Sequence, residues 1–84
     1  MTTRQLLKKM LTDRGMFDHQ ADAVLAKALP EIEKLSPDYQ ITWDRPASEY
    51  PAALYNQMFR TLCNVALVWI KENIPQAWFR PMFE

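Results

Sequence analysis

Residues 50–73 form a long stretch whose interior lacks a helix-breaking residue, and they leave few folds open to so short a chain. Pro51 falls in the first turn, where its missing N–H would be unpaired in any case, and Ser48 just ahead is a candidate N-cap. Pro75, two residues beyond the stretch, stops the helix. The sequence therefore predicts a long central helix over 50–73.

The predicted central helix is apolar on most of its sides. At about 100° per residue, one broad face collects apolar side chains: Leu54, Tyr55, Met58, Phe59, Leu62, Val65, Ala66, Trp69 and Ile70. Leu67 and Val68 extend this surface around both flanks of the C-terminal half. Such a helix is expected to be enclosed by the rest of its chain or by another chain. We expect the large side chains of Tyr55 and Trp69 to fill the core.

Length and composition indicate a single small domain over residues 1–84. Hydrophobic residues make up 49% of the chain, a globular rather than a disordered profile. A single cysteine permits no intramolecular disulfide, which favours a reducing compartment. Basic residues interrupt the N-terminal apolar positions before a signal sequence develops, and no uncharged run exceeds ten residues, against the roughly 20 of a membrane span. We expect a cytoplasmic protein without membrane contact.

The N-terminal residues predict a first helix over 3–14. Thr2 and Gln5 have the spacing of a capping box. Gly15, the only glycine of the chain, fits a left-handed C-terminal cap. Between these signals the apolar residues recur at helical spacing, so we expect an amphipathic helix that ends near Arg14.

A second helix is predicted over 18–29, with Asp18 as its N-cap. Its apolar positions follow helical spacing, and its alanines permit close approach to a neighbouring helix. Pro30 is expected to kink this helix or to split off a short segment over 31–35.

The stretch 39–43 follows a different period. Tyr39, Ile41 and Trp43 alternate with polar residues, which is typical of a strand. A single short strand leaves its edges unpaired. It is therefore either an extended loop laid on the central helix or a strand paired with a second copy of the chain. The flanking prolines favour the loop.

An irregular apolar tail follows the central helix. Pro75 and Pro81 forbid a long helix there, although the segment is rich in large apolar side chains. Tryptophan and arginine near an exposed terminus have the composition of a binding hot spot. The candidate partner-binding residues are therefore Trp78, Phe79, Arg80, Met82 and Phe83. The alternative is that the tail packs back on its own domain. Together these elements predict an all-α bundle of three to four helices around the central helix.

Metal and catalytic sites are not expected. His19 and Cys63 are the only histidine and cysteine, whereas a structural zinc site needs four ligands. We interpret His19 as a surface residue in a first helical turn and Cys63 as a small buried apolar group. A cysteine nucleophile would need an activating base and oxyanion donors, for which the sequence offers no pattern. We therefore expect neither an enzyme nor a bound cofactor.

A helix-turn-helix DNA-binding protein is the main alternative, with helices 3–14 and 18–29 as the motif. It would use residues on both helices to reach the nucleic acid: Lys8, Lys9, His19 and Gln20. Ten basic and ten acidic residues give a formal net charge of zero, which argues against a general phosphate-binding surface. An ordinary helical hairpin is the favoured interpretation.

A second alternative is an oligomer that sequesters a small anionic ligand, such as a nucleotide, at its interface. Helix N-termini and cationic side chains would hold the anion. The cations that the sequence offers for this are Arg60, Lys71 and Arg80.

The closing block VALVWIKENIPQAWFRPMFE resembles the C-terminal signature of small proteins encoded by phages and prophages. The matching elements are Trp69-Ile70, Pro75 and residues 77–83, and residues 16–18 and 20–21 match more loosely. This family carries no activity to transfer. It implies an accessory protein that binds and modulates a protein of the bacterial host. The leading hypothesis is therefore a non-enzymatic, cytoplasmic protein that contacts a protein partner or a second copy of itself.

Overall fold

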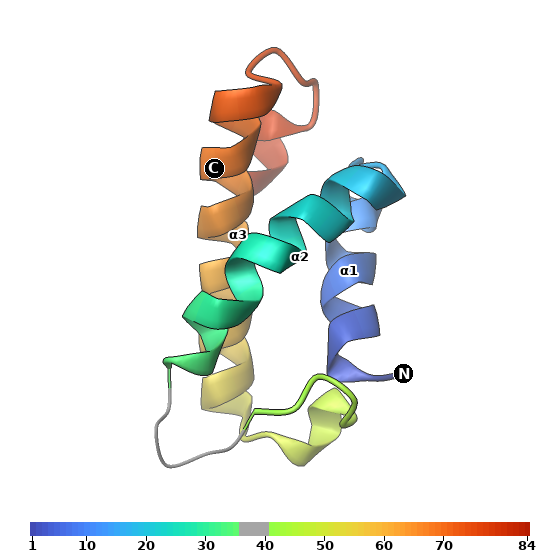
Figure 1. Ribbon diagram of the computed structural model, residues 1–84, viewed down its shortest axis with the longest axis vertical. Helices are drawn as coiled ribbons and strands as arrows, with labels where there is room; N and C mark the ends of the chain where they lie inside the picture. The colour runs from blue at the N-terminus through green and yellow to red at the C-terminus, as the bar shows by residue number, and fades with distance from the viewer. Residues whose placement is uncertain (36–40) are drawn as a thin grey trace.

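In the part of the chain that the structure describes, three α-helices and two short 3-10 helices form an all-α fold, which confirms the predicted fold class (Figure 1). The computed structural model describes residues 1–35 and 41–84. In chain order the helices are α1 (Thr3–Asp13), α2 (Asp18–Glu33), η1 (Ala47–Glu49), α3 (Ala52–Asn73) and η2 (Arg80–Phe83). Within the described ranges no strand forms, and the one isolated β-bridge joins Thr2 to Pro46.

The signals at both ends of α1 are confirmed. The Thr2 hydroxyl accepts a hydrogen bond from the Gln5 amide at 3.2 Å, and the Thr2 amide donates to Gln5 Oε1 at 2.9 Å. These two bonds satisfy backbone donors that a helix start leaves unpaired. At the other end Gly15 has a φ of 114°, which is the left-handed region that glycine tolerates best.

The start of α2 differs from the prediction by one position. Phe17, not Asp18, is the N-cap, and its amide donates to Gln20 Oε1 at 2.9 Å. The predicted Asp18 cap is therefore wrong, because a glutamine three residues after Phe17 supplies the acceptor. Asp18 lies instead in the first turn, where its negative charge suits the positive end of the helix dipole.

Pro30 does not split α2, which runs unbroken to Glu33. Of the two outcomes expected at Pro30, the splitting off of a separate segment over 31–35 is therefore wrong. Pro30 and Ala26 are both exposed, so the carbonyl that loses its helical partner lies on the solvent side. Ala28 and Ile32 on the opposite side are fully buried and hold the helix against the core.

The central helix α3 begins at Ala52, with Pro51 at the N-cap position. The predicted Ser48 cap is wrong, because Ser48 lies inside η1. The buried residues of α3 recur every fourth position and form the spine of the core: Leu54, Met58, Leu62, Ala66 and Ile70. Tyr55 and Trp69 were expected in the core, but both are only partly buried, at its edges.

The segment 41–50 lies across the start of α1. The Thr3 amide and hydroxyl both donate to the Arg45 carbonyl, each at 2.7 Å, and the Arg4 amide donates to Trp43 at 3.2 Å. The first turn of a helix leaves its amides unpaired, and these bonds satisfy two of them. The backbone of this loop is therefore bonded to α1, while Ile41 and Trp43 pack against the core to which the central helix contributes.

Side chains hold the same loop in place. The Tyr50 hydroxyl donates to the Thr42 carbonyl at 2.7 Å and accepts from the Thr42 amide at 3.0 Å. Trp43 Nε1 donates to Glu33 Oε1 at 3.1 Å and ties the loop to the end of α2. Residues 41–43 form no strand, and residues 39 and 40 of the predicted strand lie outside the described ranges.

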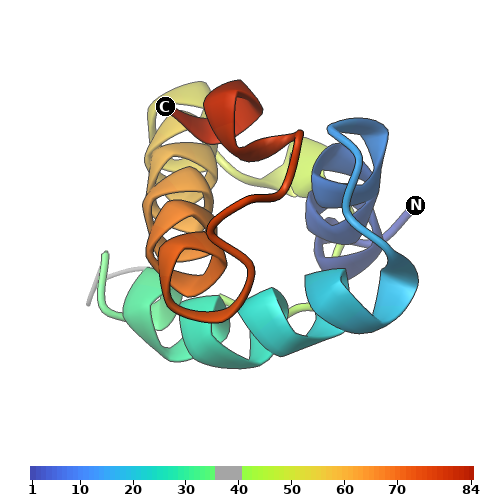
Figure 2. The same ribbon diagram turned by 90° about the horizontal axis from the view of Figure 1, so that it is seen from above.

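Seen from above, α1, α2, α3 and the tail after α3 form four sides around the core (Figure 2). Helix α2 packs against both α1 and α3, and η2 packs on α3. Between α1 and α3, the Arg14 guanidinium lies 4.8 Å from the centre of the Phe59 ring and 6.0 Å from that of Phe83. Arg14 thus joins α1, α3 and the tail through cation–π contacts.

Candidate protein-interaction surfaces

The tail divides its large apolar side chains between the core and the surface. Phe79 and Phe83 are 4% and 7% exposed, and their rings meet edge to face with centroids 6.4 Å apart. Trp78 and Met82 are 70% and 56% exposed. Of the five candidate partner-binding residues, the two phenylalanines therefore belong to the core, whereas Trp78 and Met82 remain available to a partner.

Arg80, the remaining candidate of the tail, holds the segment together. Its Nη1 donates to the Pro75 carbonyl at 3.0 Å, and its Nε lies 3.4 Å from a carboxylate oxygen of Glu84. Both contacts are within the tail, so Arg80 fixes the turn that presents Trp78.

Phe17 joins Trp78 on one surface, although the two lie far apart in the sequence. Phe17 is 66% exposed at the start of α2, and an open cavity of about 450 Å³ lies between it and the tail. We define the aromatic patch as the apolar residues that line this cavity and are not buried: Phe17, Ile74, Pro75, Ala77 and Trp78. No sequence pattern had placed Phe17 beside the tail.

The Trp78 ring packs on the turn between α1 and α2. A Cβ atom added at Gly15 would lie 2.6 Å from Cζ2 of Trp78 and 3.0 Å from Cβ of Phe79. Only glycine leaves room for the indole ring to lie on the backbone here. One side of the indole is thus seated on the turn, while most of its surface remains exposed.

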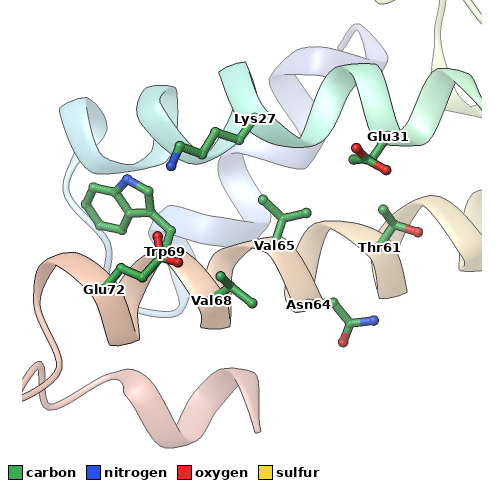
Figure 3. Close-up of a pocket in the computed structure, with 8 residues that line it drawn as sticks. All are labelled: Lys27, Glu31, Thr61, Asn64, Val65, Val68, Trp69 and Glu72. Atoms are coloured by element: carbon green, nitrogen blue, oxygen red, sulfur yellow. The ribbon is translucent and has the colours of Figure 1, made fainter.

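A second apolar surface lies between α2 and α3. It is an open groove of about 410 Å³, shown in close-up in Figure 3. We refer to it as the groove, and its lining residues are Lys27, Glu31, Thr61, Asn64, Val65, Val68, Trp69 and Glu72. Val68 is 56% exposed. The flank of α3 that was expected to be enclosed is therefore left open by its own chain.

A third hollow, of about 450 Å³, lies where η2 meets α3, and Cys63, Arg60, Met82 and Phe83 line it in part. Cys63 is half-buried rather than fully buried. Burial raises the pKa of the Cys63 thiol above its usual value, and the positive charge of Arg14 partly offsets this rise. A raised pKa lowers the thiolate fraction, which is the opposite of what a nucleophilic cysteine needs.

The side chains proposed for DNA binding make contacts within the chain. Lys8 Nζ lies 3.0 Å from a carboxylate oxygen of Asp22, and Lys9 Nζ lies 2.9 Å from one of Asp13. These pairs lie at the surface and contribute little stability, but they place acidic groups beside both lysines.

His19 and Gln20, the other two residues of this alternative, are also engaged. The His19 ring stacks on Phe17, with 6.0 Å between centroids, and Gln20 caps α2. His19 is exposed, as expected. Within residues 1–35 and 41–84, no group of three or more histidine, cysteine or acidic side chains could hold a metal ion.

Comparisons with protein-family models, curated proteins and solved structures returned no match. None of the described helices is long and apolar enough to cross a membrane.

Proposed function

We propose that this protein acts by binding another protein through the aromatic patch, without catalysing a reaction. The observation that supports this proposal is the joint exposure of Phe17 and Trp78 beside one cavity. Large exposed aromatic side chains are a cost to a small soluble domain unless a partner covers them. Tryptophan is also the residue type most enriched among interface hot spots.

The support beneath Trp78 favours tight binding. The indole rests on the Gly15 turn, and its ring meets that of Phe79 edge to face with centroids 5.7 Å apart. A side chain already held in place loses less conformational entropy when a partner binds. The same side chain in a solvated, irregular tail would have to be ordered on binding.

The chemistry of the patch indicates the kind of partner. Its lining is mainly apolar, with the amides of Gln20 and Gln76 as polar groups. Such a surface suits an apolar or aromatic anchor of another protein with few charges. In line with the resemblance to phage-encoded proteins, we propose a host bacterial protein as the partner and modulation of that protein, in the cytoplasm, as the role.

The test is affinity capture from bacterial lysate with wild type, Trp78→Ala and Phe17→Ala as baits, with and without nuclease. We expect one protein to be retained by the wild type at near-equal stoichiometry in both arms and to be lost with either variant. Met82→Ala is the matched control, because it removes an exposed apolar side chain of the same tail outside the patch. It should retain the partner.

Binding of the purified partner, measured by calorimetry, then separates contact from folding. We expect Trp78→Ala to weaken binding by about 2 kcal/mol or more, a typical hot-spot loss, with an unchanged circular dichroism spectrum. Retention of the same partner by Trp78→Ala would contradict the proposal. Capture that depends wholly on nucleic acid would instead support the helix-turn-helix alternative.

A further inference from the structure

The groove leaves one flank of the central helix uncovered. Val65, Val68 and Trp69 supply its apolar part, and Val68 is more than half exposed. These residues lie on one stripe of α3, one helical turn apart. The aromatic patch is a separate surface, because the two cavities have no lining residue in common. A partner at the patch would leave the groove open.

Polar groups of complementary kinds lie at the two ends of the groove (Figure 3). The Lys27 amine and the Glu72 carboxylate lie beside Trp69 at one end. Glu31 and Thr61 lie at the other end. Each end therefore offers a hydrogen-bond donor and a carboxylate, with the valines between them.

We propose that the groove binds a second copy of this chain in an antiparallel, two-fold arrangement. Two-fold contacts are reciprocal: if one residue meets a second residue of the partner, the reverse pair forms as well. With the axis crossing α3 just after Ala66, Val68 packs on the partner's Val65. The same axis places the Thr61 hydroxyl beside the partner's Glu72 carboxylate.

The charges on α2 fit the same axis. Lys27 and Glu31 are one helical turn apart, and their side chains reach opposite ends of the groove (Figure 3). The two-fold axis therefore brings Lys27 against the partner's Glu31, and the reverse pair forms with it. The Glu31 carboxylate lies 3.8 Å from Nζ of Lys34, beyond hydrogen-bond distance, so it can still accept a hydrogen bond from the second copy.

This match in position and sign favours a second copy over an unrelated partner. A valine pair and two polar pairs obey one axis, which a surface without self-complementarity would not provide. The net charge of the chain is zero, so two copies approach without overall repulsion. A standard interface covers about 800 Å² per partner, roughly a seventh of the 5213 Å² that the chain exposes.

The test is sedimentation equilibrium of the full chain at concentrations up to about 1 mM, where a small interface associates. We expect concentration-dependent dimers for the wild type. Lys27→Glu and Glu31→Lys should each weaken self-association by about tenfold or more, because each places like charges opposite one another. Asp44→Lys, an exposed charge reversal on the loop over 41–50, is the matched control and should dimerise as the wild type does.

Mixing the two weakened variants gives the decisive measurement. In a mixed dimer of Lys27→Glu with Glu31→Lys, every reciprocal pair again joins opposite charges. An equimolar mixture should therefore associate as tightly as the wild type, although neither variant does so alone. A wild type that stays monomeric throughout, or a mixture no tighter than its components, would overturn the proposal.

The outcome is independent of the aromatic patch. Trp78→Ala should dimerise like the wild type, whereas Val68→Asp, a charge in the middle of the exposed groove, should abolish association. Val68 is exposed in the single chain, so this variant is expected to fold, and its circular dichroism spectrum checks that it does. Loss of dimers in Trp78→Ala would move the self-association to the patch and overturn the assignment to the groove.

Discussion

The loop over 41–50 and the tail over 74–84 are the two irregular segments of the described chain that pack on the helices, and they are held by different forces. Polar bonds hold the loop: backbone bonds to the start of α1 and the paired bonds between Tyr50 and Thr42. Aromatic packing holds the tail, with Phe79 and Phe83 buried and Trp78 seated on the Gly15 turn.

The difference shows what each segment contributes. The loop needs few apolar side chains, and its large ones, Ile41 and Trp43, are partly buried. Two buried rings already anchor the tail, yet it also exposes Trp78 and Met82. Apolar surface beyond what anchoring requires is the physical sign of a binding role. Variants that remove the contacts of one segment at a time therefore test whether the loop and the tail are held independently.

The largest expected effect comes from Phe79→Ala in the tail. Removing a buried phenylalanine side chain leaves a cavity and costs about 3–5 kcal/mol of unfolding free energy. Phe79 also supports the Trp78 ring, so the aromatic patch should lose its shape as well. Urea unfolding measures the loss. Met82→Ala removes an exposed side chain and should change the free energy of unfolding by less than about 0.5 kcal/mol. A loss equal to that of Phe79→Ala would contradict the assignment of Phe79 to the core and of Met82 to the surface.

Gly15→Ala is expected to destabilise by about 1–3 kcal/mol, since it combines an unfavourable positive φ with a clash against Trp78. The double variant with Trp78→Ala removes the clash with the indole but keeps the backbone strain and the close contact with Cβ of Phe79. It should therefore be less destabilised than the sum of the two single variants. Thermal unfolding of all three variants measures this coupling, and strict additivity would show that Trp78 does not rest on the turn.

Tyr50→Phe tests the loop and should cost about 1–2 kcal/mol, because the ring stays while the Thr42 amide and carbonyl lose their shared partner. Hydrogen exchange should also become faster at the Thr42 amide and at the Thr3 amide. The Thr3 amide donates to the carbonyl of Arg45, which belongs to the same loop. The tail should keep its protection. Faster exchange at the Met82 amide, which donates to the Phe79 carbonyl, would show that the two segments are not anchored separately.

The smallest expected effect concerns the thiol of Cys63, in the hollow between α3 and η2. Burial raises the pKa of the Cys63 thiol in the folded state. The folded state therefore favours the neutral thiol. The stability that this preference contributes is present at lower pH and is lost as the pH rises through the raised pKa. Alkylation at pH 8 should therefore be slower than in denatured protein. Phe83→Ala, which opens the hollow beside Cys63, should speed it, and an unchanged rate would show that the tail does not shield the thiol.

Much of the fold follows from the sequence, because local signals and long-range packing agree over each helix. The three α-helices, the capping box at Thr2 and the conformation of Gly15 are as predicted. The errors occur where two local signals compete. Gln20 moves the cap of α2 from Asp18 to Phe17, and the burial of Ile32 keeps the helix continuous through Pro30.

The candidate interaction surfaces were harder to predict from the sequence than the helices. Within the tail, Phe79 and Phe83 are buried while Trp78 and Met82 are exposed, and no helical period in the sequence predicts this, because the tail forms only the short 3-10 helix η2. Phe17 could not be assigned to the patch, because its proximity to the tail depends on how α1 and α3 are placed by α2. The groove likewise requires the packing of α2 on α3, which no local pattern specifies.

The bonds from Thr3 and Arg4 to Arg45 and Trp43 can form only after the ribosome has released residues 43–45. Ribosomes release a chain from its N-terminus, so α1 and α2 leave the exit tunnel before the residues that complete the first turn of α1. Until residue 45 has emerged, the α1 start depends on its own capping box and on water. The first half of the chain therefore emerges as a helical hairpin whose first helical turn is completed only by residues of the second half.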